Sequence, residues 1–154
     1  MKIRQRRLEA DHRDVLAAFA NHPHVRLLAA EGNPPERYTF EIGVKGMREG
    51  TEGEYAAAGI HSVEVFLPMD YPQRPPFCRM TTPVFHPNID PQKICIGDHW
   101  SAGLALPQLV MQIAQMICYQ SYNVKSPLNA KAAAWVERNL DRLPLDRSDL
   151  SASP

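Results

Sequence analysis

Residues 86–95 read His86-Pro87-Asn88-Ile89-Asp90-Pro91-Gln92-Lys93-Ile94-Cys95. A His-Pro-Asn turn is followed, seven residues after the asparagine, by a cysteine that stands between Ile94 and Ile96. The stretch therefore combines a thiol with a side-chain amide donor in a loop that prolines make rigid. A thiol nucleophile and an amide that can donate to an oxyanion are the groups that acyl transfer through a thioester uses.

Two further motifs flank this stretch. Tyr71-Pro72-Gln73-Arg74-Pro75-Pro76 lies upstream, and Trp100-Ser101-Ala102-Gly103-Leu104 lies downstream. Prolines cluster over residues 68–76 and 83–91, which is typical of rigid loops inside a fold rather than of a low-complexity linker. Residues 84–105 show no periodic pattern, and a loop of about twenty residues inside a compact domain is usually functional.

The bulk composition fits one globular domain. The chain has 154 residues, of which 44% are apolar, enough for one hydrophobic core. We assign residues 1–143 to this domain and residues 144–154 to a polar tail, which we expect to be frayed. The formal net charge is zero, from 17 basic and 17 acidic residues, whereas domains that bind nucleic acid are usually strongly basic. We therefore expect no nucleic-acid partner.

Membrane insertion and secretion are both disfavoured. No apolar run approaches the roughly 18 residues needed to span a bilayer. The basic N-terminus is followed by Leu8-Glu9-Ala10-Asp11-His12 rather than by the apolar segment of a signal peptide. Three cysteines without a CxxC pair argue against a disulfide framework. We expect a cytoplasmic protein without a membrane partner.

Apolar periodicity predicts three helices and four strands. The helices are expected over residues 4–20, 106–120 and 129–140, with Pro107 in a first turn and Asn129 as a cap. The strands are expected over residues 25–30, 38–44, 63–67 and 77–80. Residues 45–60 carry four glycines and predict a long flexible connection, with a weak strand around Glu54-Tyr55.

This order of elements indicates an α+β fold: an N-terminal helix, a four-stranded antiparallel meander, a long active-site loop and two C-terminal helices. The spacing of apolar residues also predicts which side of each helix is buried. The predicted inward residues are Leu8, Val15, Leu16 and Phe19 in the first helix, Leu106, Leu109, Val110, Ile113, Met116 and Ile117 in the second, and Ala132, Ala133, Val136 and Leu140 in the third.

The element order, together with Tyr71-Pro72-x-x-Pro75-Pro76, His86-Pro87-Asn88 and Ile94-Cys95, resembles the ubiquitin-conjugating enzyme family. The resemblance covers roughly residues 4–140, and its three motifs occur in the family's order and spacing. The composition and segments such as Gly32-Asn33-Pro34-Pro35-Glu36 look more like the bacterial members found with ubiquitin-like conjugation operons.

The resemblance implies a thioester carrier. An activating enzyme would hand the C-terminal glycine of a ubiquitin-like protein to Cys95, and an amine of a target protein, usually lysine, would then attack the thioester. Asn88 is implied either as a donor to the oxyanion or as a brace for the loop that carries the donor, and His86 as mainly structural. No cofactor is expected.

Other interpretations of the same residues stay open. Cys95 could be a buried core cysteine, which is the role we expect for Cys78 and Cys118. His86 could act as the base of a Cys-His hydrolase, although no third, orienting residue stands at a recognisable spacing. Finally, His86, Cys95, Asp98 and His99 could bind zinc, although their spacing matches no motif with a mechanical basis. We expect no metal.

Two weaker candidates are Asp98 and Ser126. The family often has an acidic residue two positions after the cysteine, where this chain has Gly97, so Asp98 is offset by one. It often has an aspartate or serine just before a Pro-Leu pair, and Ser126 precedes Pro127-Leu128. Both would help to desolvate or orient the incoming amine, and Asp98 could equally be a solvated loop carboxylate.

The resemblance also implies partner-binding residues. Arg4, Arg6 and Arg7 could bind an acidic patch of the activating enzyme, or could simply form a solvated basic face. Gln73 stands where the family commonly has an aromatic side chain that binds RING-type ligases, which argues against a standard ligase interface and for action without a ligase. Trp100 is expected to pack its loop against the domain.

Two classes of function compete with the thioester carrier. A binding module of the same fold would recognise a ubiquitin-like modifier or a partner without chemistry, although such variants usually lack the cysteine. A metal-dependent or Cys-His hydrolase is the other alternative. A Cys95→Ala substitution separates the first from the carrier, since binding survives it and conjugation does not.

Overall fold

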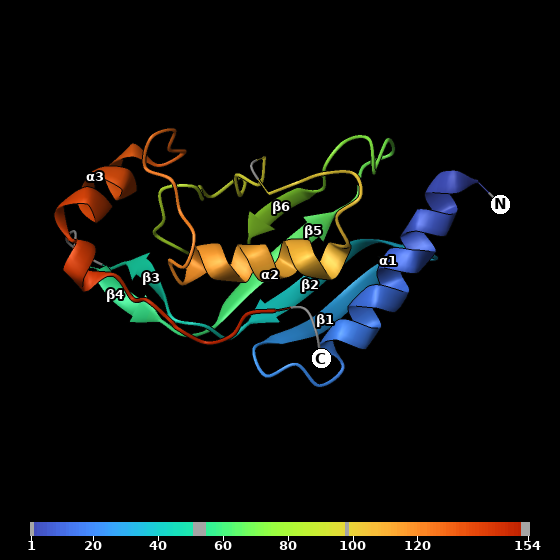
Figure 1. The fold of residues 1–154 in the computed structure, drawn as a ribbon, viewed down its shortest axis with the longest axis horizontal. Helices are drawn as coiled ribbons and strands as arrows, with labels where there is room; N and C mark the ends of the chain where they lie inside the picture. The colour runs from blue at the N-terminus through green and yellow to red at the C-terminus, as the bar shows by residue number, and fades with distance from the viewer. Residues whose placement is uncertain (1, 51–54, 98, 152–154) are drawn as a thin grey trace.

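Four antiparallel strands form the main sheet in the computed structural model of the chain, which describes residues 2–50, 55–97 and 99–151 (Figure 1). The strand order is β1-β2-β5-β6. Their bounds are β1 (Val25–Gly32), β2 (Pro35–Ile42), β5 (His61–Phe66) and β6 (Phe77–Met80). Each of the four pairs antiparallel with the next one along the chain, which confirms the predicted meander.

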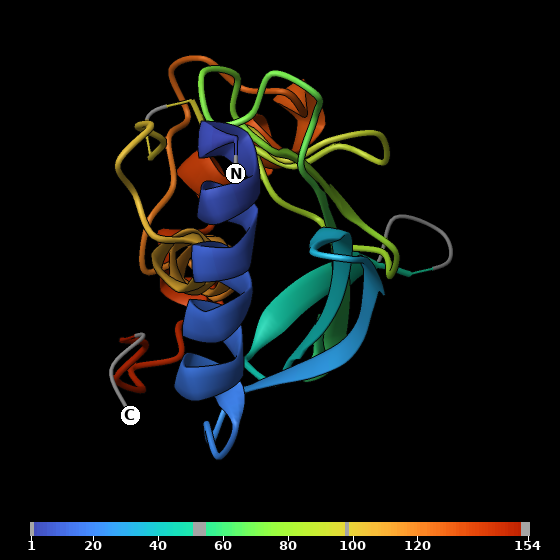
Figure 2. The same ribbon diagram turned by 90° about the vertical axis from the view of Figure 1, so that its right-hand side faces the viewer.

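Two of the three helices that the structure describes, α1 and α2, cover one face of this sheet (Figure 2), and α3 lies at the end of the molecule far from α1 (Figure 1). The three helices are α1 (Ile3–Phe19), α2 (Leu106–Ile117) and α3 (Ala130–Arg138), and a 3₁₀ turn, η2 (Leu140–Arg142), follows α3. All six residues predicted to face inward on α2 are buried. Asn129 caps α3 as predicted, because its side chain accepts a hydrogen bond from the Ala132 N–H at 3.0 Å.

The two faces of the sheet differ in chemistry because side chains alternate along each strand. Tyr38 and Phe40 on β2 and Val63 and Val65 on β5 are fully buried against the helices. On the opposite face, Glu64 accepts contacts from Arg37 at 2.6 Å and from Arg79 at 3.2 Å. The apolar alternation thus fixes which side the helices cover.

The connection over residues 45–60 is more regular than the flexible link that was predicted, although the weak strand predicted around Glu54-Tyr55 has a counterpart that begins at Tyr55. It contains a second, two-stranded sheet, β3 (Gly46–Glu49) paired with β4 (Tyr55–Ala58); Glu54 lies outside the described residues. Met47 and Tyr55 pack with Phe85 and Trp135 in a hydrophobic cluster separate from the main core. The glycines obscured β3, the strand that was not predicted, and tertiary packing stabilises both short strands. Gly46 is required there, since an added Cβ would lie 2.7 Å from the His61 ring.

Three smaller predictions were wrong. Leu16 and Leu140 are 49% and 63% exposed, because α1 turns only part of its apolar stripe inward and α3 ends before Leu140. The tail is not frayed over residues 144–151. Leu150 is 3% exposed in the main core, and Gln120 Nε2 donates to the carbonyl oxygens of Asp146 and Ser148. Among the described residues, no helix is both long enough and apolar enough to cross a membrane.

Candidate active site

The predicted functional stretch closes into a small hairpin. The Cys95 N–H donates to the Asn88 carbonyl at 2.9 Å, Ile89 pairs with Ile94, and the Asp90 N–H donates to the Lys93 carbonyl at 3.0 Å. Residues 88 and 95 therefore face each other across the hairpin. The seven-residue spacing between Asn88 and Cys95 is the spacing of a cross-strand pair.

The hairpin presents the Cys95 thiol outward. Ile94 and Ile96 are buried, and the Ile94 N–H donates to the Cys78 carbonyl of β6 at 2.8 Å. Since successive side chains of an extended chain point to opposite sides, two anchored isoleucines turn Cys95 toward solvent. It is half-buried, and it is unbonded to either of the other cysteines.

The remaining two cysteines are packing residues, as predicted. Cys78 and Cys118 are both buried. Burial raises the pKa of the Cys78 thiol to about 12 and also raises the pKa of Cys118. Because the thiolate is the nucleophile, these two thiols are inert near neutral pH.

Both ends of the Asn88 side-chain amide bind the same residue. Its Nδ2 donates to the Asn123 carbonyl at 2.8 Å, and its Oδ1 accepts from the Asn123 N–H at 2.8 Å. We call this pair of hydrogen bonds the Asn88–Asn123 clamp. The carbonyl of Pro87 adds two bonds to the same loop, from the N–H groups of Leu128 and Asn129 at 2.8 and 3.0 Å. This geometry fits the brace, one of the two roles expected for Asn88, and uses one of the two N–H groups on Nδ2.

His86 lies inside the protein. Its Nδ1 accepts from the Asn88 N–H at 3.0 Å, so the neutral ring carries its proton on Nε2. Burial lowers the pKa of His86 to about 3. Such a ring is a poor general base, because its affinity for a proton is far below that needed near neutral pH. The position of His86 therefore argues against a Cys-His hydrolase and fits a structural part.

The weaker candidates have different outcomes. Ser126 is exposed in the loop over residues 121–129 that Asn88 and Pro87 hold against the hairpin. Asp98 lies outside the described residues. Among residues 2–50, 55–97 and 99–151, no group of three His, Cys, Asp or Glu side chains is placed to hold a metal ion.

Two of the four arginines of α1 are engaged within the chain. Arg4 binds Glu36 at 3.2 Å and the Pro68 carbonyl at 2.8 Å. Arg7 binds the buried Asp11 at 3.1 Å and donates to the carbonyl oxygens of Ala102 and Leu104, which follow the candidate cysteine. Arg6 is exposed. Arg4 and Arg7 therefore have structural roles within this chain, which could account for them without the predicted binding to a partner.

Arg7 joins two loops. Its guanidinium lies 5.1 Å from the Tyr71 ring, and the Tyr71 hydroxyl donates to Asp11. Trp100 packs on Tyr71 with 5.7 Å between ring centroids, as its predicted packing role requires. Gln73 is exposed in the Tyr71 loop. Helix α1 therefore ties the proline-rich loop to the loop that follows Cys95.

Two residues at the site were missed by the sequence analysis. Asn123 carries the clamp, but it is 35 residues from Asn88 and nothing in its local pattern marks it. Tyr119 donates its hydroxyl hydrogen bond to the Phe85 carbonyl at 2.7 Å, and its ring centroid lies 4.8 Å from that of His86. For Tyr119, the sequence offered one indication of a role at the site: two tyrosines, Tyr119 and Tyr122, stand close together just after an apolar helix.

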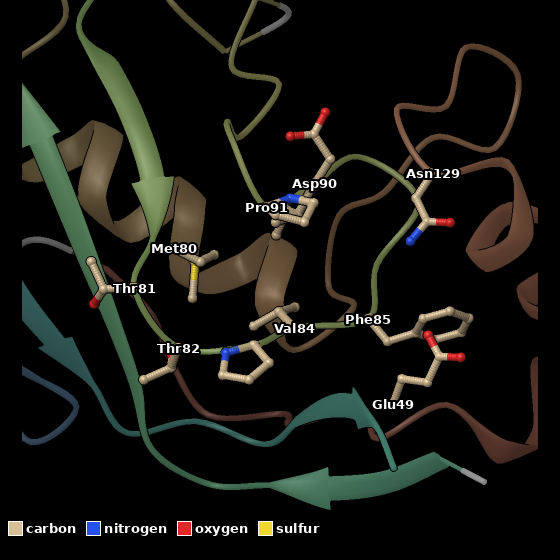
Figure 3. A pocket seen from close by; sticks show the side chains of 11 residues that line it. Glu49, Met80, Thr81, Thr82, Val84, Phe85, Asp90, Pro91 and Asn129 are labelled. Carbon is tan, nitrogen blue, oxygen red and sulfur yellow. The ribbon is translucent and has the colours of Figure 1, made fainter. Parts of the chain in front are cut away.

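A groove of about 340 Å³ lies beside the hairpin (Figure 3). Ile89, Asp90 and Pro91 of the hairpin line it together with Glu49, Phe85 and Asn129. Neither Cys95 nor Asn88 lines it. The candidate thiol is thus outside this cavity, and it is half-buried rather than enclosed.

Comparisons with known proteins agree on one family. The sequence profile of the ubiquitin-conjugating enzymes matches residues 22–143. The chain is 34% identical over 94 residues to ubiquitin-conjugating enzyme E2 13 of Saccharomyces cerevisiae, an alignment that covers 58% of this chain and 60% of the yeast protein. It is 35% identical over 80 residues to ubiquitin-conjugating enzyme E2 21 of Caenorhabditis elegans, covering 49% of this chain and 37% of that protein.

A solved structure shares the fold. A Trypanosoma cruzi protein assigned as a ubiquitin-conjugating enzyme superposes with a TM-score of 0.62 over 86% of this chain and 89% of its own, at 16% identity. The chain spans about a third to three fifths of the length of the curated relatives it matches.

Proposed function

Because this chain belongs to the ubiquitin-conjugating enzyme family, we propose that it carries a ubiquitin-like protein as a thioester on Cys95 and transfers it to an amine of a target protein. The observation that carries the proposal is the hairpin over residues 88–95. It holds one half-buried thiol at the position that pairs with Asn88, while the two other thiols are buried.

The first step is a thioester exchange. The Cys95 thiolate attacks the modifier's C-terminal carbonyl carbon on the activating enzyme, the new S–C bond forms, and the activating enzyme's cysteine leaves as a thiolate. A thiol suits this task because it is a strong nucleophile and later a good leaving group. In the second step a lysine amine forms the C–N bond, loses a proton, and releases Cys95.

Asn88 and His86 support this chemistry by holding the backbone. The clamp engages both polar atoms of the Asn88 amide, so we assign Asn88 to bracing the loop over residues 121–129. His86 accepts from the Asn88 N–H and fixes the turn from inside. Ser126, exposed in the braced loop, is proposed to contact the incoming amine.

The partners follow from the reaction. An activating enzyme must supply the modifier, and a lysine-bearing protein must accept it. Arg6 and Gln73 are the exposed residues among those predicted to bind partners. A free thiol nucleophile needs a reducing compartment, which agrees with a cytoplasmic location. Kinship with bacterial operon-encoded members stays a prediction.

Intact mass spectrometry under non-reducing conditions tests the proposal. The protein is incubated with ATP, ubiquitin and ubiquitin-activating enzyme, beside Cys95→Ser and Cys118→Ala variants. We expect a reducible adduct of ubiquitin mass on the wild type and on Cys118→Ala, and a reductant-stable ester or no adduct on Cys95→Ser. A reducible adduct on Cys95→Ser would move the chemistry to another cysteine. No adduct on the wild type, with the activating enzyme itself charged, would contradict transfer of ubiquitin.

A further inference from the structure

Tyr119 has an unusual backbone conformation. It follows the end of α2 with φ at +62°, the one positive value among the non-glycine residues that the structure describes. This left-handed conformation is the one that glycine normally supplies at the end of a helix, since a Cβ is disfavoured there. A tyrosine persists in it only if its side chain makes contacts that compensate, and such outliers concentrate at functional sites.

The Tyr119 side chain contacts both halves of the candidate active site. Its hydroxyl donates to the Phe85 carbonyl at 2.7 Å, and its ring lies 4.8 Å from the His86 ring. The other contact is with Tyr122, whose ring packs edge-on at 5.5 Å. The side chain is 3% exposed, so these contacts are made away from water.

Those contacts adjoin the two residues of the Asn88–Asn123 clamp. Phe85 and His86 precede Asn88 in the chain by three and two residues, and the His86 ring accepts a hydrogen bond from the Asn88 N–H. Tyr122 precedes Asn123 in the chain. Asn88 in turn accepts the Cys95 N–H. A continuous set of contacts therefore runs from Tyr119 through His86 and Asn88 to the backbone of Cys95.

We propose that Tyr119 is a positioning residue for the reaction at Cys95: by fixing His86 on one side and Tyr122 on the other, it sets the geometry of the Asn88–Asn123 clamp. The inference rests on the proposed function, because it assigns Tyr119 to the step in which an amine attacks a Cys95 thioester. Loss of the Tyr119 hydroxyl loosens the clamp, and a loosened clamp misplaces the loop that the amine meets.

The chain offers matched controls. Tyr119→Phe removes one hydroxyl and keeps the ring. Tyr38→Phe removes a hydroxyl that is equally buried but has no hydrogen-bond partner among the described residues. Ile42→Val trims a buried side chain at the end of β2, and so lowers stability without changing a residue of the clamp or a hydrogen bond that holds it.

The first of two experiments measures the reaction at Cys95 with a small acyl group, so the identity of the modifier is not needed. Cys95 is acylated with excess N-acetylglycine thiophenyl ester, the thiophenol leaves, and the excess reagent is removed. Free lysine is then added, and mass spectrometry follows release of the acyl group. We expect Tyr119→Phe to slow this aminolysis about fivefold, with Tyr38→Phe and Ile42→Val within about twofold of the wild type. In an Asn88→Ala background, Tyr119→Phe should add no further slowing, because the two residues act through one clamp.

The second experiment measures how firmly the Asn88–Asn123 clamp holds. Amide hydrogen exchange by NMR reports the Asn123 N–H, which donates to Asn88 Oδ1. We expect exchange about tenfold faster in Tyr119→Phe and unchanged in Ile42→Val at a temperature where both remain folded. Unchanged exchange in Tyr119→Phe would overturn the coupling. Faster exchange with normal aminolysis, or a slowing fully additive with Asn88→Ala, would overturn its role in the reaction. Neither experiment uses a modifier, so failure of ubiquitin transfer would count against the proposed function alone.

Discussion

The main sheet with α2 and the loops around Cys95 are held together by different interactions. In the sheet and α2, rows of apolar side chains alternate or repeat at helical spacing and meet in one core, as Phe40, Val65 and Leu109 do. Around Cys95, side-chain polar groups bind backbone groups of distant segments, as Asn88 binds Asn123 and Tyr119 binds Phe85. The first region sets how stable the fold is, whereas the second sets where the reacting groups stand.

The largest expected effect separates the two regions completely. Cys95→Ala should abolish the thioester, since the nucleophile is gone, while unfolding free energy changes by less than about 1 kcal/mol because the thiol is only half-buried and the substitution removes one atom. Adduct formation by mass spectrometry and urea unfolding measure the two quantities. A Cys95→Ala protein that still formed a reducible adduct would show that the hairpin thiol is not the carrier.

Truncation within the sheet should have the opposite result. Phe40 is fully buried on β2, where it packs edge-on against Phe19 of α1 with 5.6 Å between ring centroids. Phe40→Ala should cost about 3–5 kcal/mol of unfolding free energy through lost burial and the cavity left behind. Below its lowered melting temperature the variant should still charge Cys95 at a rate close to the wild type's. A parallel loss of charging in the folded variant would mean that the two regions are not separable.

Acid should weaken both regions, because each holds a buried neutral histidine. Burial lowers the pKa of His86 to about 3 from 6.5, and it also lowers the pKa of His61, the first residue of β5 in the main sheet. Between pH 6.5 and 3 the unfolded chain therefore binds more protons at His86 than the folded chain does, so stability falls as the pH falls through this window. The slope from His86 alone should approach about 1.4 kcal/mol per pH unit.

Urea unfolding from pH 7 to pH 4.5 measures this slope. In a His86→Gln variant, the unfolding free energy should fall less steeply with decreasing pH than in the wild type. His61 should account for the remaining pH dependence. Asp11 acts in the opposite direction, since burial raises its pKa and its folded form takes up a proton first. Equal slopes in the wild type and His86→Gln would contradict the buried neutral state of His86.

Removing the clamp should slow the reaction more than it destabilises the fold. Asn88→Ala deletes both hydrogen bonds to Asn123 but leaves the hairpin's backbone pairing intact. We expect aminolysis of a Cys95 thioester to slow about 10- to 100-fold, a barrier increase of about 1.4–2.8 kcal/mol. Asn88→Asp keeps the acceptor for the Asn123 N–H and should lose less. An Asn88→Asp rate as low as that of Asn88→Ala would assign the effect to the lost donor.

The sequence predicts the first region better than the second, for a physical reason. Strand and helix periodicity is local, so residues 77–80 and the buried face of α2 were predicted from their own spacing. The clamp joins residues 35 apart, and no local pattern reports such a pair. Tyr119 was missed because glycine is the usual marker of a left-handed helix end. The spacing of Asn88 and Cys95, by contrast, could have been interpreted as a hairpin pair.

The smallest expected effect concerns Asn129, a residue that contacts both regions. Its side chain caps α3 by accepting the Ala132 N–H, while its own N–H donates to the Pro87 carbonyl beside the clamp. Asn129→Ala removes the cap and keeps the backbone bond, so it should cost about 1 kcal/mol of unfolding free energy. Asn129→Ser, which can still cap, should recover most of this loss. Aminolysis should be unchanged in both variants, because the backbone bond to Pro87 is what ties α3 to the site. If Asn129→Ala slowed aminolysis while Asn129→Ser did not, the stability of α3 would itself control the loop over residues 121–129, and the two regions would be coupled through this cap.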